Sequence, residues 1–384
     1  MASTFMKQTH QFLHKPIEDK TIVWFENTNE YLVLENTTAD ILKRLSKGLS
    51  VKEIATALAK KLSVPLDKTI DFVLDLEKRL YTPKTKKEVD IVNDYRDVKI
   101  PDSFEFTKYY KVNNVVFKIS YSSETELSYV HPKFAHLTIK KPVKFDHFFD
   151  VFIENKYIFF YVNKEFIGAW SPKEIHYFQG KFSMELIQKI HNKEEDKWMG
   201  VFHASAVSNG KKSILFLGDS GNGKSTSLAL LQANTFSCLA DDFVPIDVKK
   251  QEIYSFPAAI SIKKSSLDTL LPIYPELKTT AEYNFTRLNK VVRYLKPNNN
   301  NFFNHLPCND LIFIKYQQDA ELQCTKIASV DAFQQLVPDS WLSPLKDNAA
   351  VFLDWFSTLQ CYQLTYSNNE EMIATVSKIF DDDL

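Results

Sequence analysis

Residues 213–226 read SILFLGDSGNGKST, and this stretch decides the fold of the C-terminal half of the chain. An apolar run leads into a Gly-x-x-x-x-Gly-Lys-Ser pattern, and a second apolar run, 228–231, follows it. This order predicts a strand, a phosphate-binding loop and a helix. A glycine-rich surface turn would account for the loop alone, but not for the apolar runs on both sides of it.

The predicted loop supplies the groups that bind a nucleoside triphosphate. Its glycines can adopt positive φ, which turns backbone N–H groups toward phosphate oxygens, and the helix N-terminus favours an anion. The lysine adds a charge near the β- and γ-phosphates, and the serine hydroxyl binds Mg²⁺. The residues predicted to bind the nucleotide are Gly218, Asp219, Ser220, Gly221, Asn222, Gly223, Lys224, Ser225 and Thr226.

Two adjacent carboxylates, Asp241 and Asp242, follow the apolar run 236–240 shortly after the loop. One could hold a metal ion while the other takes a proton, although an Asp-Asp pair at a strand end is often a turn or a helix cap. His203 lies in a strand-like segment before the loop, where a lone histidine is more often a core residue than a functional one.

The run from His203 through the loop to Asp241-Asp242 resembles the catalytic domain of HPr kinase/phosphorylase over about residues 200–340. Those enzymes phosphorylate a seryl hydroxyl of a protein with ATP and Mg²⁺. The resemblance implies that His203 and Lys224 lie beside the transferred phosphoryl group, that Asp241 is the general base, and that Ser225 and Asp242 support the metal ion.

Two features depart from that family. Thr226 replaces the acidic residue that commonly follows the loop serine, and residues 255–263 (SFPAAISIK) replace the family's partner-binding segment. The chain is therefore more similar to the divergent HPr-kinase-like proteins of peptide-modification systems. Lys290 and Arg293 are candidate phosphate clamps, because charge on the transferred group requires cations outside the loop.

The composition excludes several classes of protein. Lys and Arg number 47 against 48 Asp and Glu, so no strong net charge points to nucleic acid or to an anionic membrane. The chain has no apolar run of about 18 residues and no signal peptide at its start, and its four cysteines are widely spaced. We expect a reduced, cytoplasmic protein, and homo-oligomerisation is left open.

The first 83 residues predict a small winged-helix domain. Two β-rich runs, 22–25 and 31–34, flank a turn and indicate a hairpin, and three segments with helical spacing follow. Thr37-x-x-Asp40 and Ser50-x-x-Glu53 have the form of capping boxes, and the third helix begins near Pro65. That helix is rich in acidic residues, which argues against DNA binding.

The segment 24–80 resembles PqqD-like domains, which bind the leader of a ribosomally made precursor peptide. In that family the leader adds as a strand to the hairpin edge beside the third helix. The residues that this implies for peptide binding are Tyr31, Leu32, Val33, Leu34, Glu35, Phe72, Asp75 and Arg79. A structural wing without a partner is the alternative.

The sequence thus predicts an α/β and α+β multidomain protein. We expect a winged-helix domain over 1–83, a charged linker over 84–99, a β-rich subdomain over 100–195 and an HPr-kinase-like P-loop domain over 196–384. The expected function is ATP-dependent phosphorylation of a Ser or Thr hydroxyl on a precursor peptide bound through its leader. The alternatives are a small-molecule kinase with a structural N-terminal domain and a peptide chaperone switched by nucleotide.

Overall fold

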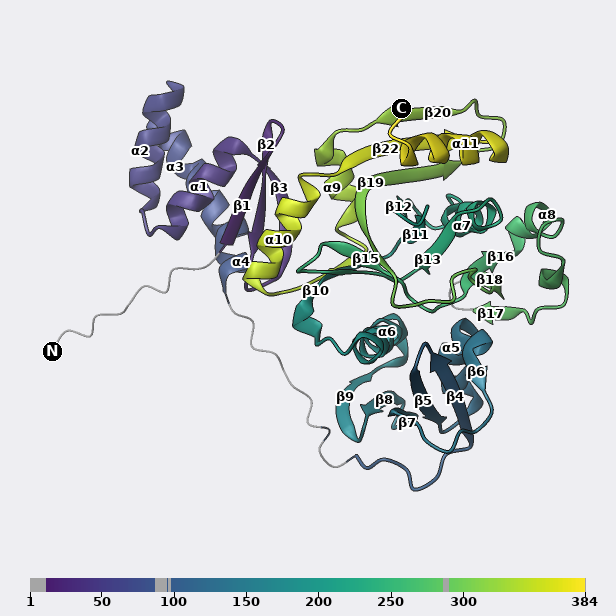
Figure 1. Ribbon diagram of the computed structural model, residues 1–384. Coiled ribbons are helices and arrows are strands. Elements are labelled where there is room, and N and C mark those ends of the chain that lie inside the picture. Colours follow the sequence, from purple (N-terminus) through teal and green to yellow (C-terminus); the bar gives the residue numbers. More distant parts are fainter. Residues whose placement is uncertain (1–11, 87–94, 96–97, 286–289, 384) are drawn as a thin grey trace. The chain divides into compact units, whose positions relative to one another are not determined.

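The computed structural model describes residues 12–86, 95, 98–285 and 290–383 (Figure 1). The protein is a mixed α/β multidomain chain that forms two compact units. Unit 1 contains the described part of residues 1–92 together with 328–358, and unit 2 contains the described part of 93–327 together with 359–384. The predicted continuous domain over 196–384 differs from this division. Most of the predicted linker, 84–99, lies outside the described residues.

Unit 1 contains the predicted hairpin and three helices. An antiparallel sheet in the order β1-β2-β3 is followed by the helices, with Pro65 directly before α3 as predicted. The elements are β1 (Phe12–Ile17), β2 (Lys20–Phe25), β3 (Glu30–Glu35), α1 (Asn36–Ser46), α2 (Val51–Leu62), α3 (Leu66–Leu76), a π-helical turn (Glu77–Tyr81) and α4 (Thr82–Thr85). The sequence indicated only an edge within residues 1–20 and did not predict the strand β1.

The two predicted capping boxes have different outcomes. Ser50 caps α2, since its Oγ accepts from the Glu53 N–H at 3.3 Å and the Glu53 carboxylate accepts from the Ser50 N–H at 2.7 Å. The box at Thr37 is wrong, because α1 already begins at Asn36 and its N-cap, Glu35, makes no side-chain capping bond. The strand β3 runs directly into the helix and leaves no room for a cap at Thr37.

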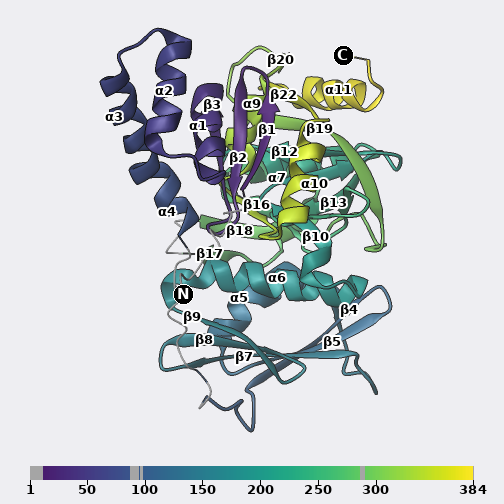
Figure 2. The same ribbon diagram turned by 90° about the vertical axis from the view of Figure 1, so that its left-hand side faces the viewer.

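Two helices from late in the chain complete unit 1. They are α9 (Ser329–Leu336) and α10 (Lys346–Phe356), with the short strand β21 (Ser340–Leu342) between them. The ring of Tyr31 on β3 packs edge-on against Phe333 of α9 and Phe352 of α10, with centroids 6.1 Å and 5.3 Å away. Lys15 of β1 also pairs with Asp354 of α10 at 2.5 Å. Figure 2 shows α10 beside β1.

The predicted β-rich subdomain of unit 2 is a six-stranded sheet in the order β6-β4-β5-β7-β8-β9. Its strands are β4 (Phe106–Val112), β5 (Val115–Tyr121), β6 (Thr138–Ile139), β7 (His147–Glu154), β8 (Tyr157–Val162) and β9 (Glu165–Trp170). Helices α5 (Glu124–Phe134) and α6 (Ile175–His191) pack on this sheet. Phe178 and Phe182 of α6 contact Phe160 of β8 and form a buried aromatic core.

The predicted phosphate loop, residues 218–223, follows β12 in a larger sheet of unit 2, whose strands have the order β13-β11-β12-β19 and continue through β15, β14 and β10. β12 runs parallel to β19, and β19 runs parallel to β22. The strands are β10 (Trp198–Phe202), β11 (Ser205–Ser208), β12 (Ser213–Leu217), β13 (Ser237–Asp241), β14 (Val244–Asp247), β15 (Glu252–Tyr254), β19 (His305–Tyr316), β20 (Gln323–Lys326) and β22 (Gln360–Tyr366). β14 pairs antiparallel with β15.

Helices α7 (Lys224–Gln232) and α11 (Asn369–Phe380) pack against each other and against the large sheet (Figure 1). The strand β22 lies between the helices α10 and α11 in sequence and pairs with β19. A third sheet in the order β16-β18-β17 follows β15, with β16 (Ile260–Lys263), β17 (Tyr283–Phe285), β18 (Lys290–Leu295) and the short helix α8 (Leu267–Leu270). In the described ranges, no helix combines the length and apolar character needed to cross a bilayer.

Candidate functional site

The predicted strand, loop and helix are present at residues 213–232. β12 ends at Leu217, the loop spans 218–223, and α7 begins at Lys224. Gly218, Gly221 and Gly223 have φ values of 133°, 109° and 98°, which residues other than glycine rarely adopt. A Cβ on Gly218 would also lie 2.7 Å from the carbonyl oxygen of Ile314. The glycines are therefore required by the loop's path and by its close packing on β19.

The loop lysine and its neighbours point into the turn of the loop. Lys224 is largely buried, and its Nζ donates to the carbonyl oxygens of Gly218 and Asp219. The N–H of Asn222 donates to the Asp219 carbonyl at 3.1 Å, which closes the turn. One helical turn later, the hydroxyls of Thr226 and Ser266 lie 2.7 Å apart. The ammonium group of Lys224 is thus held against the backbone of the loop.

Asp241 is a buried carboxylate at the end of β13. One oxygen accepts from Ser205 Oγ at 2.6 Å, the other accepts from the Ser261 N–H at 3.0 Å, and the loop hydroxyl Ser225 Oγ lies within 3.1 Å of both. Burial raises the pKa of Asp241 to about 6, with a further contribution from the charge of Asp242, and the hydrogen bonds oppose that rise. Asp241 therefore holds the hydroxyl of Ser225 in a fixed position.

Asp242 and His203 have different surroundings from Asp241. Asp242 adopts a left-handed backbone with φ of 62° directly after β13, and its side chain lines the cavity over the phosphate loop. His203 is exposed in the bend between β10 and β11 and lines the same cavity. The general expectation that a lone histidine is a core residue does not hold here. The left-handed residue turns the second carboxylate away from the buried face that the first one occupies.

Sequence reasoning missed the opposite wall of this cavity. Ser261, Lys263, Ser265 and Ser266 line it, and Lys263 Nζ donates to Ser220 Oγ of the loop at 2.9 Å. Ser261 and Lys263 lie two residues apart on β16, so their side chains project from the same face of the strand. The alternation of Ile260, Ser261, Ile262 and Lys263 carried that signal in the sequence.

Of the two predicted phosphate clamps, Arg293 does not line this cavity. Arg293 donates to the carbonyl oxygens of Leu277 and Lys278 and lies 3.4 Å from Glu282, so its guanidinium holds the turn that precedes β17. Lys290 begins β18, but its side chain lies outside what the structure describes. Among the described residues that line this cavity, Lys263 is a second cation beside Lys224.

The residues predicted to bind a peptide all lie in unit 1, on β3, on α3 and on the π-helical turn after α3. Tyr31 contributes to packing against α9 and α10, and burial raises its pKa well above the ordinary value. Leu32 and Leu34 pack against the core formed with α1, α2 and α3, while Val33 is partly buried. Glu35, Phe72, Asp75 and Arg79 are exposed, and the last two form an ion pair at 2.6 Å.

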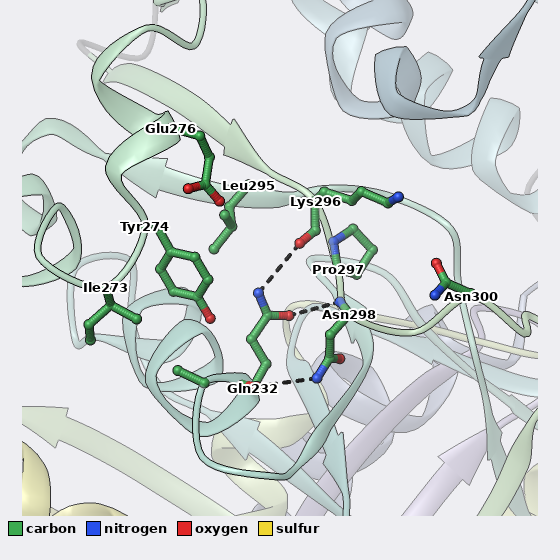
Figure 3. Close-up of a pocket in the computed structure, with 10 residues that line it drawn as sticks. Gln232, Ile273, Tyr274, Glu276, Leu295, Lys296, Pro297, Asn298 and Asn300 are labelled. Atoms are coloured by element: carbon green, nitrogen blue, oxygen red, sulfur yellow. Dashed lines mark hydrogen bonds between the residues drawn. The ribbon is translucent and has the colours of Figure 1, made fainter.

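A second cavity of about 570 Å³ lies at the C-terminal end of α7 (Figure 3). There the N–H of Asn298 donates to Gln232 Oε1, and Asn298 Nδ2 donates to the Gln232 carbonyl oxygen. Gln232 Nε2 in turn donates to the Lys296 carbonyl at 3.4 Å. Asn298 also accepts from the Cys238 N–H at 2.9 Å. These amide contacts tie the end of the phosphate-loop helix to the segment after β18, so the polar groups on this wall serve the fold.

Comparison with known proteins gives no relative. No protein-family model matches the chain, and no curated protein matches it.

Proposed function

We propose that this chain is a phosphotransferase that transfers the γ-phosphoryl group of ATP to a hydroxyl group. The observation that carries the proposal is the cavity over the phosphate loop, which joins the loop residues Lys224 and Ser225 with His203, Asp242 and Lys263. The loop would bind the phosphates, and cations on two sides would neutralise their charge. An exposed histidine and carboxylate beside them are what a transfer reaction needs and what a simple nucleotide-binding loop does not.

The donor set fits Mg²⁺ delivered together with the nucleotide. Among the residues that the structure describes, no cluster of three or more His, Cys, Asp or Glu side chains could hold a metal ion. In kinase sites, however, Mg²⁺ is usually held by one or two carboxylates and by the substrate phosphates. Ser225, with Asp241 behind it, would hold the ion here, and the ion would neutralise charge on the phosphates.

The geometry favours a different division of labour between the two carboxylates from the one that the family resemblance implies. Both oxygens of Asp241 already accept hydrogen bonds from Ser205, Ser225 and Ser261, so it supports the metal-binding hydroxyl. Asp242 faces the cavity and would accept the proton of the acceptor hydroxyl as its oxygen attacks the γ-phosphorus. The bond to the β,γ-bridging oxygen breaks, and the products are ADP and a phosphoester.

We propose a ribosomally made precursor peptide as the acceptor, bound through its leader to unit 1. This rests on the resemblance to PqqD-like domains and on β3 being an edge strand of its sheet. An added strand would gain main-chain hydrogen bonds along Glu30–Glu35, and the exposed ring of Phe72 on α3 would offer apolar contact. The packing of Tyr31 against α9 and α10 leaves the backbone of β3 to provide this affinity.

That same packing favours the small-molecule kinase as the second candidate. A sheet with one face against α1–α3 and Tyr31 against α9 and α10 is also what a purely structural domain would have. A nucleotide-switched peptide chaperone would not explain why His203 and Asp242 line the cavity.

The test is incubation with Mg²⁺ and labelled ATP, with and without synthetic precursors encoded by neighbouring genes. Mass measurement should find one or more phosphoryl groups on a Ser or Thr of one precursor, and none with the Lys224→Ala variant. Removing the leader while keeping the acceptor residue should raise the apparent KM. Transfer to a small molecule alone would establish the second candidate, and ATP turnover without any acceptor would argue against both.

A further inference from the structure

An aromatic side chain stands exposed beside the phosphate loop, on the flank away from the carboxylates. Tyr316 is the last residue of β19, and its side chain is 47% exposed. The next residues, Gln317 to Asp319, are also exposed. A single exposed ring is common on protein surfaces, but this one lies beside the predicted phosphate loop, where its face could meet a ligand.

The backbone of Tyr316 is held by the loop, and its ring packs on Tyr366. The N–H of Tyr316 donates to the Asn222 carbonyl at 2.9 Å. A Cβ on Gly223 would lie 3.3 Å from Tyr316 Cβ and equally far from Tyr366 Oη, so both tyrosines press against the loop glycine. Tyr316 meets the buried Tyr366 edge-on, with centroids 5.5 Å apart, and Tyr366 Oη lies 2.8 Å from Ser227 Oγ of α7. A platform that is already ordered loses little entropy when a ligand stacks on it.

The sheet order gives the direction in which a nucleotide would lie. β12, which carries the loop, has β11 and β13 on one side and β19 and β22 on the other. Asp241 and Asp242 belong to the β13 side, so the γ-phosphate end of a triphosphate faces that side. The nucleoside end then extends from the loop toward β19, where Tyr316 ends the strand.

We infer that Tyr316 is a stacking platform for the nucleobase of the phosphate donor. This inference rests on the proposed function and deepens it. The exposed π-face of a tyrosine stacks on any base, and purines offer the larger surface. Since a ring face reads no hydrogen-bond pattern, ATP and GTP should bind with similar affinity, and both should bind more tightly than CTP.

The experiment compares ligands that differ only in the nucleoside. Binding of ATP, GTP, CTP and inorganic triphosphate, each with Mg²⁺, is measured calorimetrically on the full chain. Tyr316→Ala should weaken ATP binding about 5- to 100-fold, the range that loss of one stacked base gives, and leave inorganic triphosphate unchanged. Tyr316→Phe should keep wild-type affinity, because the hydroxyl is not used. Tyr177→Ala, at an exposed tyrosine on α6, is the matched control and should change nothing.

The outcomes separate this inference from the proposed function. If ATP and triphosphate both bind the wild type and Tyr316→Ala weakens neither, or weakens both equally, the platform is wrong and the phosphate site stands. If the wild type binds neither ligand, the proposed function is wrong and the platform falls with it. Tyr316→Trp gives an independent reading, since its fluorescence should change with ATP and stay constant with inorganic triphosphate.

Discussion

The phosphate loop of unit 2 and the strand β3 of unit 1 present their residues to a ligand in different ways. In the loop, nearly every group comes from residues 218–226, and its shape follows from three glycines with positive φ. In β3, three of these side chains also serve the fold, since Leu32 and Leu34 face the core with α1–α3 and Tyr31 faces α9 and α10. A ligand site made of backbone groups can be formed by consecutive residues. The side chains of a strand, in contrast, are also needed for packing in the core.

The largest expected effect separates the two carboxylates of the phosphate cavity. Asp242→Asn should lower the transfer rate by about 10²–10⁴-fold, the usual contribution of a general base, while nucleotide binding remains. Asp241→Asn should instead weaken the Mg²⁺ dependence, because it loosens Ser225. Single-turnover rates at several Mg²⁺ concentrations measure both. Equal, modest losses in the two variants would mean that the roles are not divided.

Lys224→Ala should lower the rate on the order of 10²–10³-fold, by analogy with the loss of other groups that stabilise transition-state charge. The protein should stay folded, because the described hydrogen bonds of the ammonium group go to carbonyl oxygens of its own loop. Lys211→Ala, in the exposed turn between β11 and β12, is the matched control. Near-normal transfer by the folded Lys224 variant would refute the assignment of the loop.

In unit 1 the corresponding change should affect stability and leave chemistry intact. Phe352→Ala removes a fully buried ring that packs on Tyr31 and Phe333, and a cost of about 3–5 kcal/mol in the free energy of unfolding is expected. Deleting residues 1–83 should be worse, because it uncovers the same ring together with α9. Chemical denaturation measures the effect of Phe352→Ala. Recovery of soluble protein measures the effect of the deletion. If the truncated protein stays soluble, α9 and α10 do not depend on residues 1–83 for their folding.

Acid should affect unit 2 through His191. Burial lowers the pKa of His191 from 6.5 to about 4, and the nearby Lys193 and His305 add to the shift. Between these values the unfolded chain binds a proton that the folded chain does not, so the contribution to stability is present above pH 6.5 and is lost toward pH 4. Wild type should lose up to about 3 kcal/mol relative to His191→Phe across this window.

The comparison for His191 is His14→Phe in unit 1, which should change the pH dependence less because His14 is more exposed. Denaturation curves at pH 7, 5.5 and 4 give both differences. Parallel curves for wild type and His191→Phe would show that His191 is not buried as described.

The smallest expected effect is a gain. Tyr31 Oη is buried and has no hydrogen-bond partner among the described residues. Tyr31→Phe keeps the ring contacts with Phe333 and Phe352 and should stabilise unit 1 by about 1 kcal/mol. Precursor binding should not change if β3 recognises a peptide through its backbone. Loss of binding would mean that the hydroxyl belongs to the peptide surface, as the sequence suggested.

Local patterns in the sequence determined the phosphate loop, the hairpin of unit 1, its three helices and the β-rich subdomain. These follow from glycine conformation, residue periodicity and capping, which act over a few neighbouring residues. The order of the loop and the two aspartates also predicted that they meet, since a loop and the end of a nearby strand share one edge of a sheet.

Only the tertiary structure decided which aspartate is buried, that Lys263 and not Arg293 reaches the loop, and that residues 328–358 belong with the first 92. It also brought Tyr316, some ninety residues further along the chain, against Gly223. Each of these depends on pairing between distant segments: β11 with β13, β12 with β19, and Tyr31 with Phe352. Periodicity within a segment shows which face is apolar, but it does not show which distant segment will cover that face.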